Sequence, residues 1–265
     1  MNGDVRREVL LDAALLSRIE DACLNASAPP QQRWLDGWLL RLSPGKARRA
    51  RSVHALAPGK LSFEARLAQS DTVYRECGLP LIFRITPFSH PAALDADLAD
   101  RGFVRVDETL VMVCPNLPEA AEPLPPGLVL EQAGHSAFAE RVGAMRGSPP
   151  EHRRSHAERL ALSPVPYLGW LLRRLSDGIV VACAQTAQEA QFVGLYDVFV
   201  EPGARGQGLS RRLGSALLAG ARSSGAQHGY LQVQADNDAA VAVYRRLGFI
   251  DGYRYHYRGR PGRTS

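Results

Sequence analysis

The pattern of apolar and polar positions after residue 127 predicts strands and helices in mixed order. Segments that alternate with period two are expected to be strands, at 128–132, 167–175, 179–187, 192–200, 230–235 and 251–258. Segments with helical periodicity are expected at 135–146, 151–162, 209–224 and 238–247. In the third of these helices Leu209, Leu213 and Leu217 recur every four residues and form one buried stripe.

The first part of the chain has a similar character and is separated from the second by prolines. We expect a helix near 5–25, strands at 34–43, 51–56 and 81–85, helices at 61–77 and 93–100, and a hairpin over 104–113. Residues 115–126 are rich in proline, which ends regular structure and stiffens a connection. The expected organisation is therefore a domain at 1–114, a linker at 115–126 and a domain at 127–265.

A short internal repeat relates the two domains. A strand, a helix, the pair Gly102-Phe103 and further strand in the first half match the same series ending on Gly248-Phe249 in the second. Leu98 then falls where Tyr244 stands. We expect two copies of one fold.

A glycine-rich turn follows the strand that ends at Val198–Val200. Arg205-Gly206-Gln207-Gly208-Leu209-Ser210 leads into a helix, whose first N–H groups lack helical partners and attract an anion such as a pyrophosphate. A dinucleotide-binding fold would require a third glycine at Arg211, and a P-loop would require a Gly-Lys-Ser/Thr sequence. Neither alternative fits.

Further downstream, Asn237 or Asp236 is placed to cap a helix on which Ala240 and Tyr244 share a face. Gly248 is a natural helix stop, and Phe249 opens the next strand. Together with Arg205 and Gly208, these residues resemble the two core motifs of the GNAT superfamily of acyl-CoA-dependent N-acyltransferases. The resemblance covers roughly residues 127–258, and Ser210 departs mildly from the small residue that the pattern favours.

The resemblance implies an α+β GNAT fold, with a mixed, mostly antiparallel twisted sheet flanked by helices, in tandem. The first copy is degenerate, because residues 51–78 contain no Arg-x-x-Gly-x-Gly. We expect that copy to bind no CoA, to cover the sheet of the second and to wall off the acceptor site.

The resemblance also implies the roles of individual residues. Acetyl-CoA is the expected cosubstrate, and an amine attacks its thioester directly. Tyr244 is the expected general acid for the departing thiolate. The residues expected to bind the cofactor are Val198, Phe199, Val200, Arg205, Gly206, Gln207, Gly208, Leu209, Ser210, Arg211, Asn237 and Tyr244.

The general base is a more open question. Alternation places Asp197 and Phe199 on one face of their strand and Val198 and Val200 on the other, against the glycine-loop helix. Asp197 is the candidate base, a structural carboxylate is the alternative, and a water chain would need no dedicated base. His152 and His156 have a spacing that can hold zinc, but the missing third ligand favours a solvated or substrate-facing helix. We expect no metal.

Composition adds bounds on partners and location. The net charge is +5, carried almost wholly by arginine, and a basic surface attracts a polyanion such as CoA. The densest basic cluster is expected to be a solvated hairpin, with an anion-facing role as a further option: Arg41, Lys46, Arg48, Arg49 and Arg51. Few aromatic residues accompany it, so nucleic acid is not the expected partner. Four scattered cysteines and the lack of a signal peptide or an apolar span predict a reduced cytoplasmic protein.

The expected function is that of an N-acetyltransferase acting on a primary amine of a small molecule. A protein or peptide amine is the alternative acceptor, and a non-catalytic acyl-CoA-binding regulatory module is the alternative class. Tyr244 argues against the module, because a sensor needs no acid for a thiolate. The sequence leaves the acceptor and the oligomeric state open, and it is compatible with a homodimer.

Overall fold

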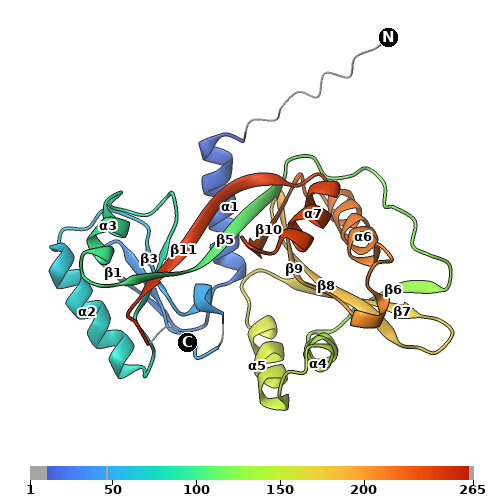
Figure 1. The fold of residues 1–265 in the computed structure, drawn as a ribbon, viewed down its shortest axis with the longest axis horizontal. Coiled ribbons are helices and arrows are strands. Elements are labelled where there is room, and N and C mark those ends of the chain that lie inside the picture. Colours follow the sequence, from blue (N-terminus) through green and yellow to red (C-terminus); the bar gives the residue numbers. More distant parts are fainter. Residues whose placement is uncertain (1–10, 46, 263–265) are drawn as a thin grey trace, which may run out of the picture.

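The computed structural model describes residues 11–45 and 47–262 and contains one twisted sheet that runs through both halves (Figure 1). In the described part of the chain the sheet has the order β1-β2-β3-β4-β11-β5-β10-β9-β8-β7-β6. The strands are β1 (Gln32–Leu35), β2 (Trp38–Arg41), β3 (Val53–Ala55), β4 (Ile82–Ile85), β5 (Val104–Cys114), β6 (Leu128–Ala133), β7 (Tyr167–Arg174), β8 (Val180–Glu189), β9 (Phe192–Val200), β10 (His228–Gln234) and β11 (Ile250–Gly259).

The pairing is mostly antiparallel, as expected. The parallel contacts are β3 with β4 and β9 with β10. The sequence prediction for 128–259 is confirmed strand by strand within a residue or two at the ends. The mixed, mostly antiparallel sheet of the predicted fold class is therefore present.

The two halves exchange their last strands. β11, from the second half, lies between β4 and β5 of the first, and β5 lies between β11 and β10 of the second (Figure 1). Both strands follow a helix and a Gly-Phe pair, which is the repeat seen in the sequence. The repeat thus places two equivalent strands side by side at the centre of the molecule.

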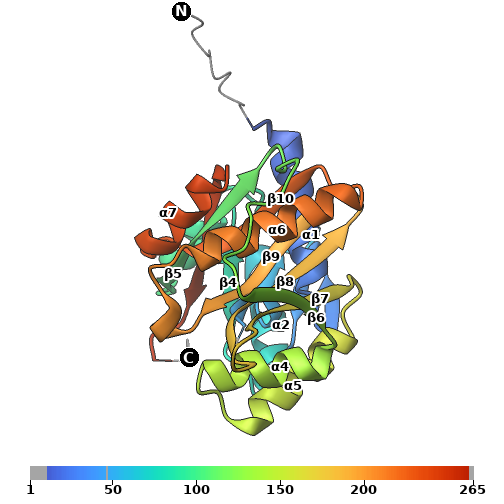
Figure 2. The ribbon, with the colours of Figure 1, turned by 90° about the vertical axis from the view of Figure 1, so that its right-hand side faces the viewer.

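Helices cover both faces of the sheet. They are α1 (Ala13–Ala26), α2 (Phe63–Glu76), α3 (Leu94–Ala99), α4 (His135–Met145), α5 (Pro150–Ala161), α6 (Leu209–Ser223) and α7 (Asp238–Arg246), with the short 3-10 turns η1 (Arg48–Ala50) and η2 (Pro202–Ala204). In the second half α6 and α7 lie on one side and α4 and α5 on the other (Figures 1 and 2). No helix of the described residues is long and apolar enough to cross a membrane.

Three apolar clusters form the core. One packs α1, α4 and α5 on the sheet around Phe138 and Tyr196, and a second packs α6 and α7 around Leu213 and Phe249. The third lies in the first half around Trp38. The sheet of the second half is therefore buried on both faces, which explains its long apolar strands.

The segment predicted as a linker lies along α6. Ser215 Oγ accepts a hydrogen bond from the Glu122 N–H, and Arg222 donates to the Leu117 carbonyl. Arg211 forms an ion pair with Glu122. The domain boundaries at 114 and 127 stay a prediction, but the strand exchange joins the two parts into one sheet.

Two strand predictions were wrong. The strand expected at 34–43 is a hairpin, because Asp36 and Gly37 adopt left-handed φ values of 44° and 86° and reverse the chain between β1 and β2. The hairpin expected at 104–113 is the single strand β5. Asp107, with a φ of 50°, lies where the register between β5 and β11 shifts, so the polar residues there mark a bulge and not a turn.

The helix predicted near 5–25 begins at Ala13, and residues 5–10 lie outside the described residues.

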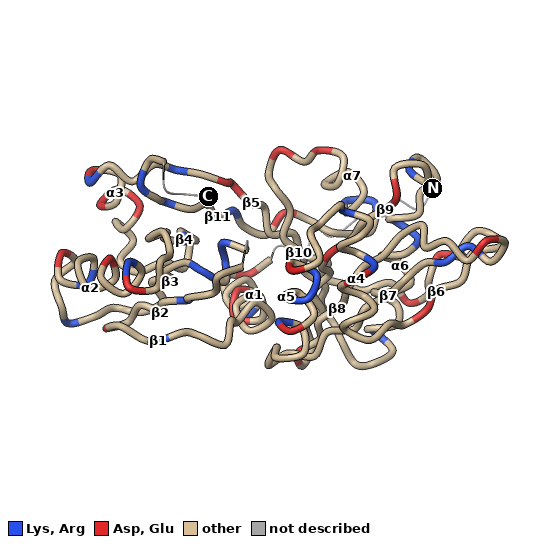
Figure 3. The backbone as a smooth tube through the Cα atoms, turned by 90° about the horizontal axis from the view of Figure 1, so that it is seen from below, with Lys and Arg blue, Asp and Glu red and all other residues tan. Residues whose placement is uncertain are grey.

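The basic cluster is not a solvated hairpin. Arg41 is buried and donates to the Leu24 carbonyl at the end of α1, which makes it a structural residue. Arg48 forms an ion pair with Asp107. Lys46 lies outside the described residues. Positive residues occur in both halves and do not form one block (Figure 3).

Candidate active site

Strands β9 and β10 separate at the centre of the second half. They pair in parallel only from His228–Phe192 to Tyr230–Gly194, although β9 continues to Val200 and β10 to Gln234. Beyond that point neither strand is the ladder partner of the other. The edge of β9 that faces β10, which includes Val198–Val200, is therefore able to pair with an extended ligand.

A bulge in β9 directs Asp197 away from α6. Cys183 of β8 pairs with Phe199 and Gln185 with Tyr196, so β9 has one extra residue between them. Asp197 has a left-handed φ of 49° at this position. Val198 and Val200 pack against the α6 cluster and Phe199 against the opposite one, so the predicted division of faces is confirmed.

Arg146 and His156 hold the Asp197 carboxylate. Arg146 Nη1 donates to Asp197 Oδ1 at 2.7 Å, and His156 Nε2 lies 3.3 Å from Oδ2. Burial raises the pKa of the Asp197 carboxyl, but the His156 hydrogen bond and the Arg146 charge outweigh it and hold this pKa well below its usual range. Asp197 is therefore ionised at neutral pH and is a weak base on its own.

A cavity of about 590 Å³ opens beside Asp197. The second half contributes Arg146, directly after α4, and residues of α5, β7, β8 and β9 to its wall. The first half contributes residues 29–31, 43–45, 47, 49 and 50. The first half thus lines the cavity, and its role of walling off an acceptor site stays a prediction. His152 and His156 line it too, so the helix carrying them faces the cavity. The described residues contain no group of His, Cys, Asp or Glu with the arrangement of a metal site.

The glycine loop ends at an uncapped helix start. Gly206 and Gly208 have φ values of 79° and 70°, the left-handed region that glycine adopts without strain. Gly208 is the N-cap of α6 and offers no side-chain cap. Within the described structure the N–H groups of Gly208–Arg211 have no hydrogen-bond partner, and a Cβ on Gly206 or Gly208 would meet no atom within 4 Å. The loop is thus an open anion site.

Side chains around the loop have separate tasks. Leu209 is buried against the sheet, whereas Ser210 is partly exposed and Gln207 is exposed. Arg205 Nε donates to the Val200 carbonyl at 3.2 Å, which ties the loop to the end of β9. The Arg211 side chain binds Glu122, so only its backbone N–H faces an anion at the helix start.

Tyr244 and Asn237 belong to α7. The Asn237 side chain accepts a hydrogen bond from the Ala240 N–H at 3.1 Å, so Asn237 is the cap. Tyr244 packs against Phe249 at 5.9 Å, and its hydroxyl has no hydrogen-bond partner among the described residues. Burial raises the pKa of this phenol. Tyr244 therefore carries its proton at neutral pH, as a general acid must.

Three cavity residues were missed by sequence reasoning. Arg49 comes from η1, Arg159 from α5 and Gln185 from β8, and all three line the cavity. Arg49 stood in the basic cluster, which was the one available signal. Arg159 and Gln185 belong to no motif, because their meeting depends on how the two halves pack.

Comparison with known proteins agrees with this geometry. Residues 144–249 match the sequence profile described as the acetyltransferase (GNAT) family. The uncharacterized N-acetyltransferase YobR of Bacillus subtilis is 28% identical over 233 residues, which are 86% of this chain and 91% of YobR. A mycothiol acetyltransferase of Saccharomonospora viridis is 33% identical over 184 residues, but the match covers only 60% of this chain and 58% of that enzyme.

Two solved structures share the fold over most of the chain. The GCN5-related N-acetyltransferase from Kribbella flavida has a TM-score of 0.69 at 20% identity, covering 94% of this chain and 96% of that one. A tandem GNAT protein from the clavulanic acid biosynthesis pathway has a TM-score of 0.63 at 15% identity, covering 78% and 73%. The profile assigns residues 144–249, within the second half, to the GNAT family of acetyltransferases, and the solved structures show the fold. With this profile match and its relatives, the chain is an acyltransferase.

Proposed function

We propose that the protein transfers an acetyl group from acetyl-CoA to a primary amine of a small molecule. The observation that carries the proposal is the uncapped start of α6 behind Gly206 and Gly208, directly after the free edge of β9. A phosphate group fits the first and an extended amide-containing arm fits the second. In CoA, the pyrophosphate is this phosphate group and the pantetheine chain is this extended arm.

The reaction then needs few groups. The amine nitrogen attacks the thioester carbon, a C–N bond forms and the C–S bond breaks. The backbone of Val198–Val200 supports the carbonyl oxygen, and the Tyr244 hydroxyl gives its proton to the departing sulfur. The amine loses one proton, and we assign its removal to Asp197 together with His156. Because Arg146 weakens the carboxylate as a base, Asp197 accepts the proton as part of this pair and not alone.

The cavity favours a small acceptor over a protein. Its volume of about 590 Å³ is in the range of small-molecule sites, and both halves of the chain enclose it. The test is thiol release from acetyl-CoA with a panel of amino acids, polyamines, aminoglycosides and peptides. We expect thiol and acetylated amine in equal amounts for a small amine. Release with peptides alone would favour the protein acceptor, and binding of acetyl-CoA without transfer to any amine would favour the regulatory module.

A further inference from the structure

Two arginines in the cavity form no ion pair with any described residue. Arg49 and Arg159 are both partly buried and both line it. Among the described residues neither guanidinium forms a hydrogen bond or a salt bridge. Burial lowers the pKa of Arg159, the Tyr167 and Asp197 groups raise it, and the nearby Arg49 charge lowers it by a smaller effect. Two like charges are thus held together away from bulk water, which is unfavourable unless an anion joins them.

The other charges of the cavity do not supply that anion. Asp197 attracts Arg159 through space, but its short contacts are with Arg146 and His156. Glu158 also lines the cavity, but it is exposed and forms no ion pair with either arginine. His152, which is exposed, adds no negative charge. The pair Arg49 and Arg159 therefore remains available to a ligand.

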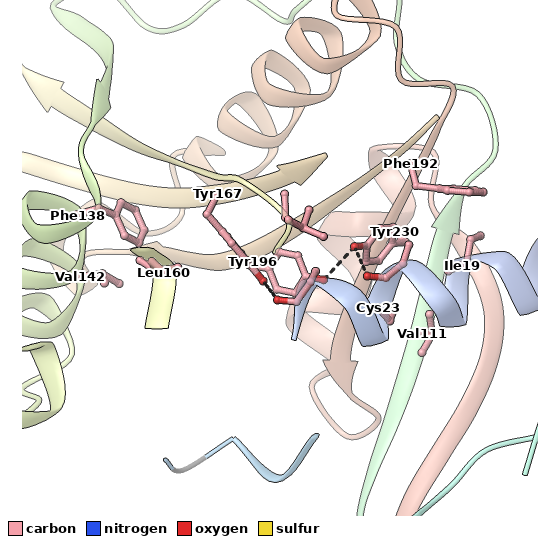
Figure 4. Packing of buried hydrophobic residues seen from close by; sticks show 14 of the residues in the cluster. Ile19, Cys23, Val111, Phe138, Val142, Leu160, Tyr167, Phe192, Tyr196 and Tyr230 are labelled. Carbon is pink, nitrogen blue, oxygen red and sulfur yellow. Dashed lines mark hydrogen bonds between the residues drawn. The ribbon is translucent and has the colours of Figure 1, made fainter. Parts of the chain in front are cut away.

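Two tyrosine rings lie beside the arginines in the cavity wall. Tyr167 and Tyr196 lie next to each other (Figure 4), with ring centroids 5.3 Å apart. The Arg49 guanidinium lies over the Tyr196 ring, 5.8 Å from its centroid. Both phenol protons are already used, because Tyr167 donates to the Ala26 carbonyl and Tyr196 to the Tyr230 hydroxyl. A cation–π contact with the Tyr196 ring uses none of the Arg49 N–H groups, so they stay available to bind.

A further unpaired donor lies in the same wall. The side chain of Gln185 is buried, with the residue 1% exposed, and its amide nitrogen has no hydrogen-bond partner. A buried donor without a partner is unfavourable and points to an acceptor oxygen that a ligand brings. Gln185 pairs across the strands with Tyr196, beside Arg49 and next to Asp197.

The segment that carries Arg49 is fixed in place. His54 is buried and its pKa is lowered well below the usual value, so its neutral ring donates to the Arg49 carbonyl at 3.0 Å. Arg48 anchors the same turn through its ion pair with Asp107. Arg49 is therefore preorganised toward the cavity, which lowers the entropy lost when it binds an anion.

From these contacts we infer that the acceptor amine carries an oxyanion, a carboxylate or a phosphate, which Arg49 and Arg159 bind while the amine lies by Asp197. The inference rests on the proposed transfer to an amine. It excludes polyamines and other purely cationic amines as the preferred acceptors, because these would meet the two arginines with like charge.

The test compares each charged amine with its neutral isostere. The probes are ω-amino acids of increasing length against their primary amides, and aminoalkyl phosphates against the matching amino alcohols. We expect kcat/KM to favour the charged member at least tenfold, and the two series distinguish a carboxylate from a phosphate. Arg49→Gln and Arg159→Gln should each lower kcat/KM for that member roughly 30-fold or more, as loss of one partner of a desolvated charge pair does.

Controls separate charge recognition from folding. Arg154→Gln removes one charge from the exposed side of α5, lines no cavity and should change nothing. Arg49→Lys should recover part of the preference, and unchanged melting temperatures and acetyl-CoA affinities should accompany all variants. Equal kcat/KM for acid and amide in the wild type, or arginine variants that weaken acetyl-CoA and not the amine, would overturn the inference.

Direct binding keeps the two proposals distinguishable. If no amine is acetylated, the proposed function fails, and calorimetry with the same amines still decides the anion site. Binding of the charged member but not of its isostere, lost in Arg49→Gln, would support the site. Equal binding of both members, or binding of neither, would reject it.

Discussion

The ionisation of the Asp197 carboxylate affects both the stability of the fold and the proposed reaction. Because its pKa lies well below the usual range, the carboxylate stabilises the fold above the pKa of an unfolded aspartate, about 4, and this stabilisation is lost as the pH falls through the folded pKa. Asp197 therefore does not titrate between pH 5 and 8. An acidic limb of the rate profile in that range would therefore not come from Asp197.

The stability of Asp197→Asn checks this account. At pH 7 we expect the free energy of unfolding to fall by roughly 1–2 kcal/mol, at the lower end for hydrogen bonds to charged groups, because the Arg146 side chain is 37% exposed and screened. The difference from the wild type should shrink as the pH drops below about 4. Urea unfolding at several pH values measures it, and a difference that is independent of pH would contradict the ion pair.

Removing the Tyr244 hydroxyl tests its catalytic role without changing the packing of its ring. Its ring packs on Phe249, and its oxygen has no protein partner among the described residues. Tyr244→Phe should therefore leave stability and acetyl-CoA affinity nearly unchanged and lower kcat about 10²–10⁴-fold. Single-turnover acetyl transfer avoids masking by product release. An unchanged single-turnover rate would assign Tyr244 to packing alone.

At the scale of elements, Asn237 caps helix α7 and is also proposed to contact CoA. Asn237→Ala removes the cap and should cost about 1 kcal/mol of stability. Asn237→Ser keeps a capping oxygen but removes the amide donors. If the amide also contacts the CoA arm, both variants should weaken acetyl-CoA binding, but only the alanine variant should melt earlier. Normal affinity in the serine variant would leave Asn237 as a cap only.

The elements around the site were predictable because their signals are local. The leucine stripe of α6, the glycine turn and the Asn237 cap are each read within about ten residues. The hairpin of β1 and β2 was missed because its turn has only two residues, Asp36 and Gly37. Apolar residues flank this turn on both sides, so the segment resembles one continuous strand. β5 was divided in error because a bulge and a turn use the same polar residues.

At the scale of the whole molecule, the exchange of β5 and β11 could not be read from the sequence. Local patterns give the strands but not their partners, and pairings such as that of Ile250 with Val113 join residues from opposite halves. Arg49 and Arg159, 110 positions apart in the sequence, meet for the same reason. The candidate cofactor loop was therefore predictable, whereas the acceptor cavity was not.

The strand exchange makes a prediction about truncation. A fragment of residues 124–265 lacks β5, so β10 and β11 lose the strand that lies between them. We expect the fragment to be insoluble or to unfold without cooperativity, because β4 is missing too, so that one edge of β10 and both edges of β11 are unpaired. Circular dichroism and thermal melting of the purified fragment measure this. A cooperative transition together with full acetyl-CoA affinity would show that the exchanged strand is dispensable.

Titration of the full-length chain with acetyl-CoA tests the central claim most directly. The first half has no glycine loop, and the second has one open helix start behind Gly208. Calorimetry should therefore give one equivalent per wild-type chain and no binding to Gly208→Trp, whose indole would enter the space expected for the pyrophosphate. Gly208→Asn, which tolerates the left-handed backbone, serves as the control for strain. Two equivalents per chain, or unchanged affinity in a folded Gly208→Trp protein, would contradict the account.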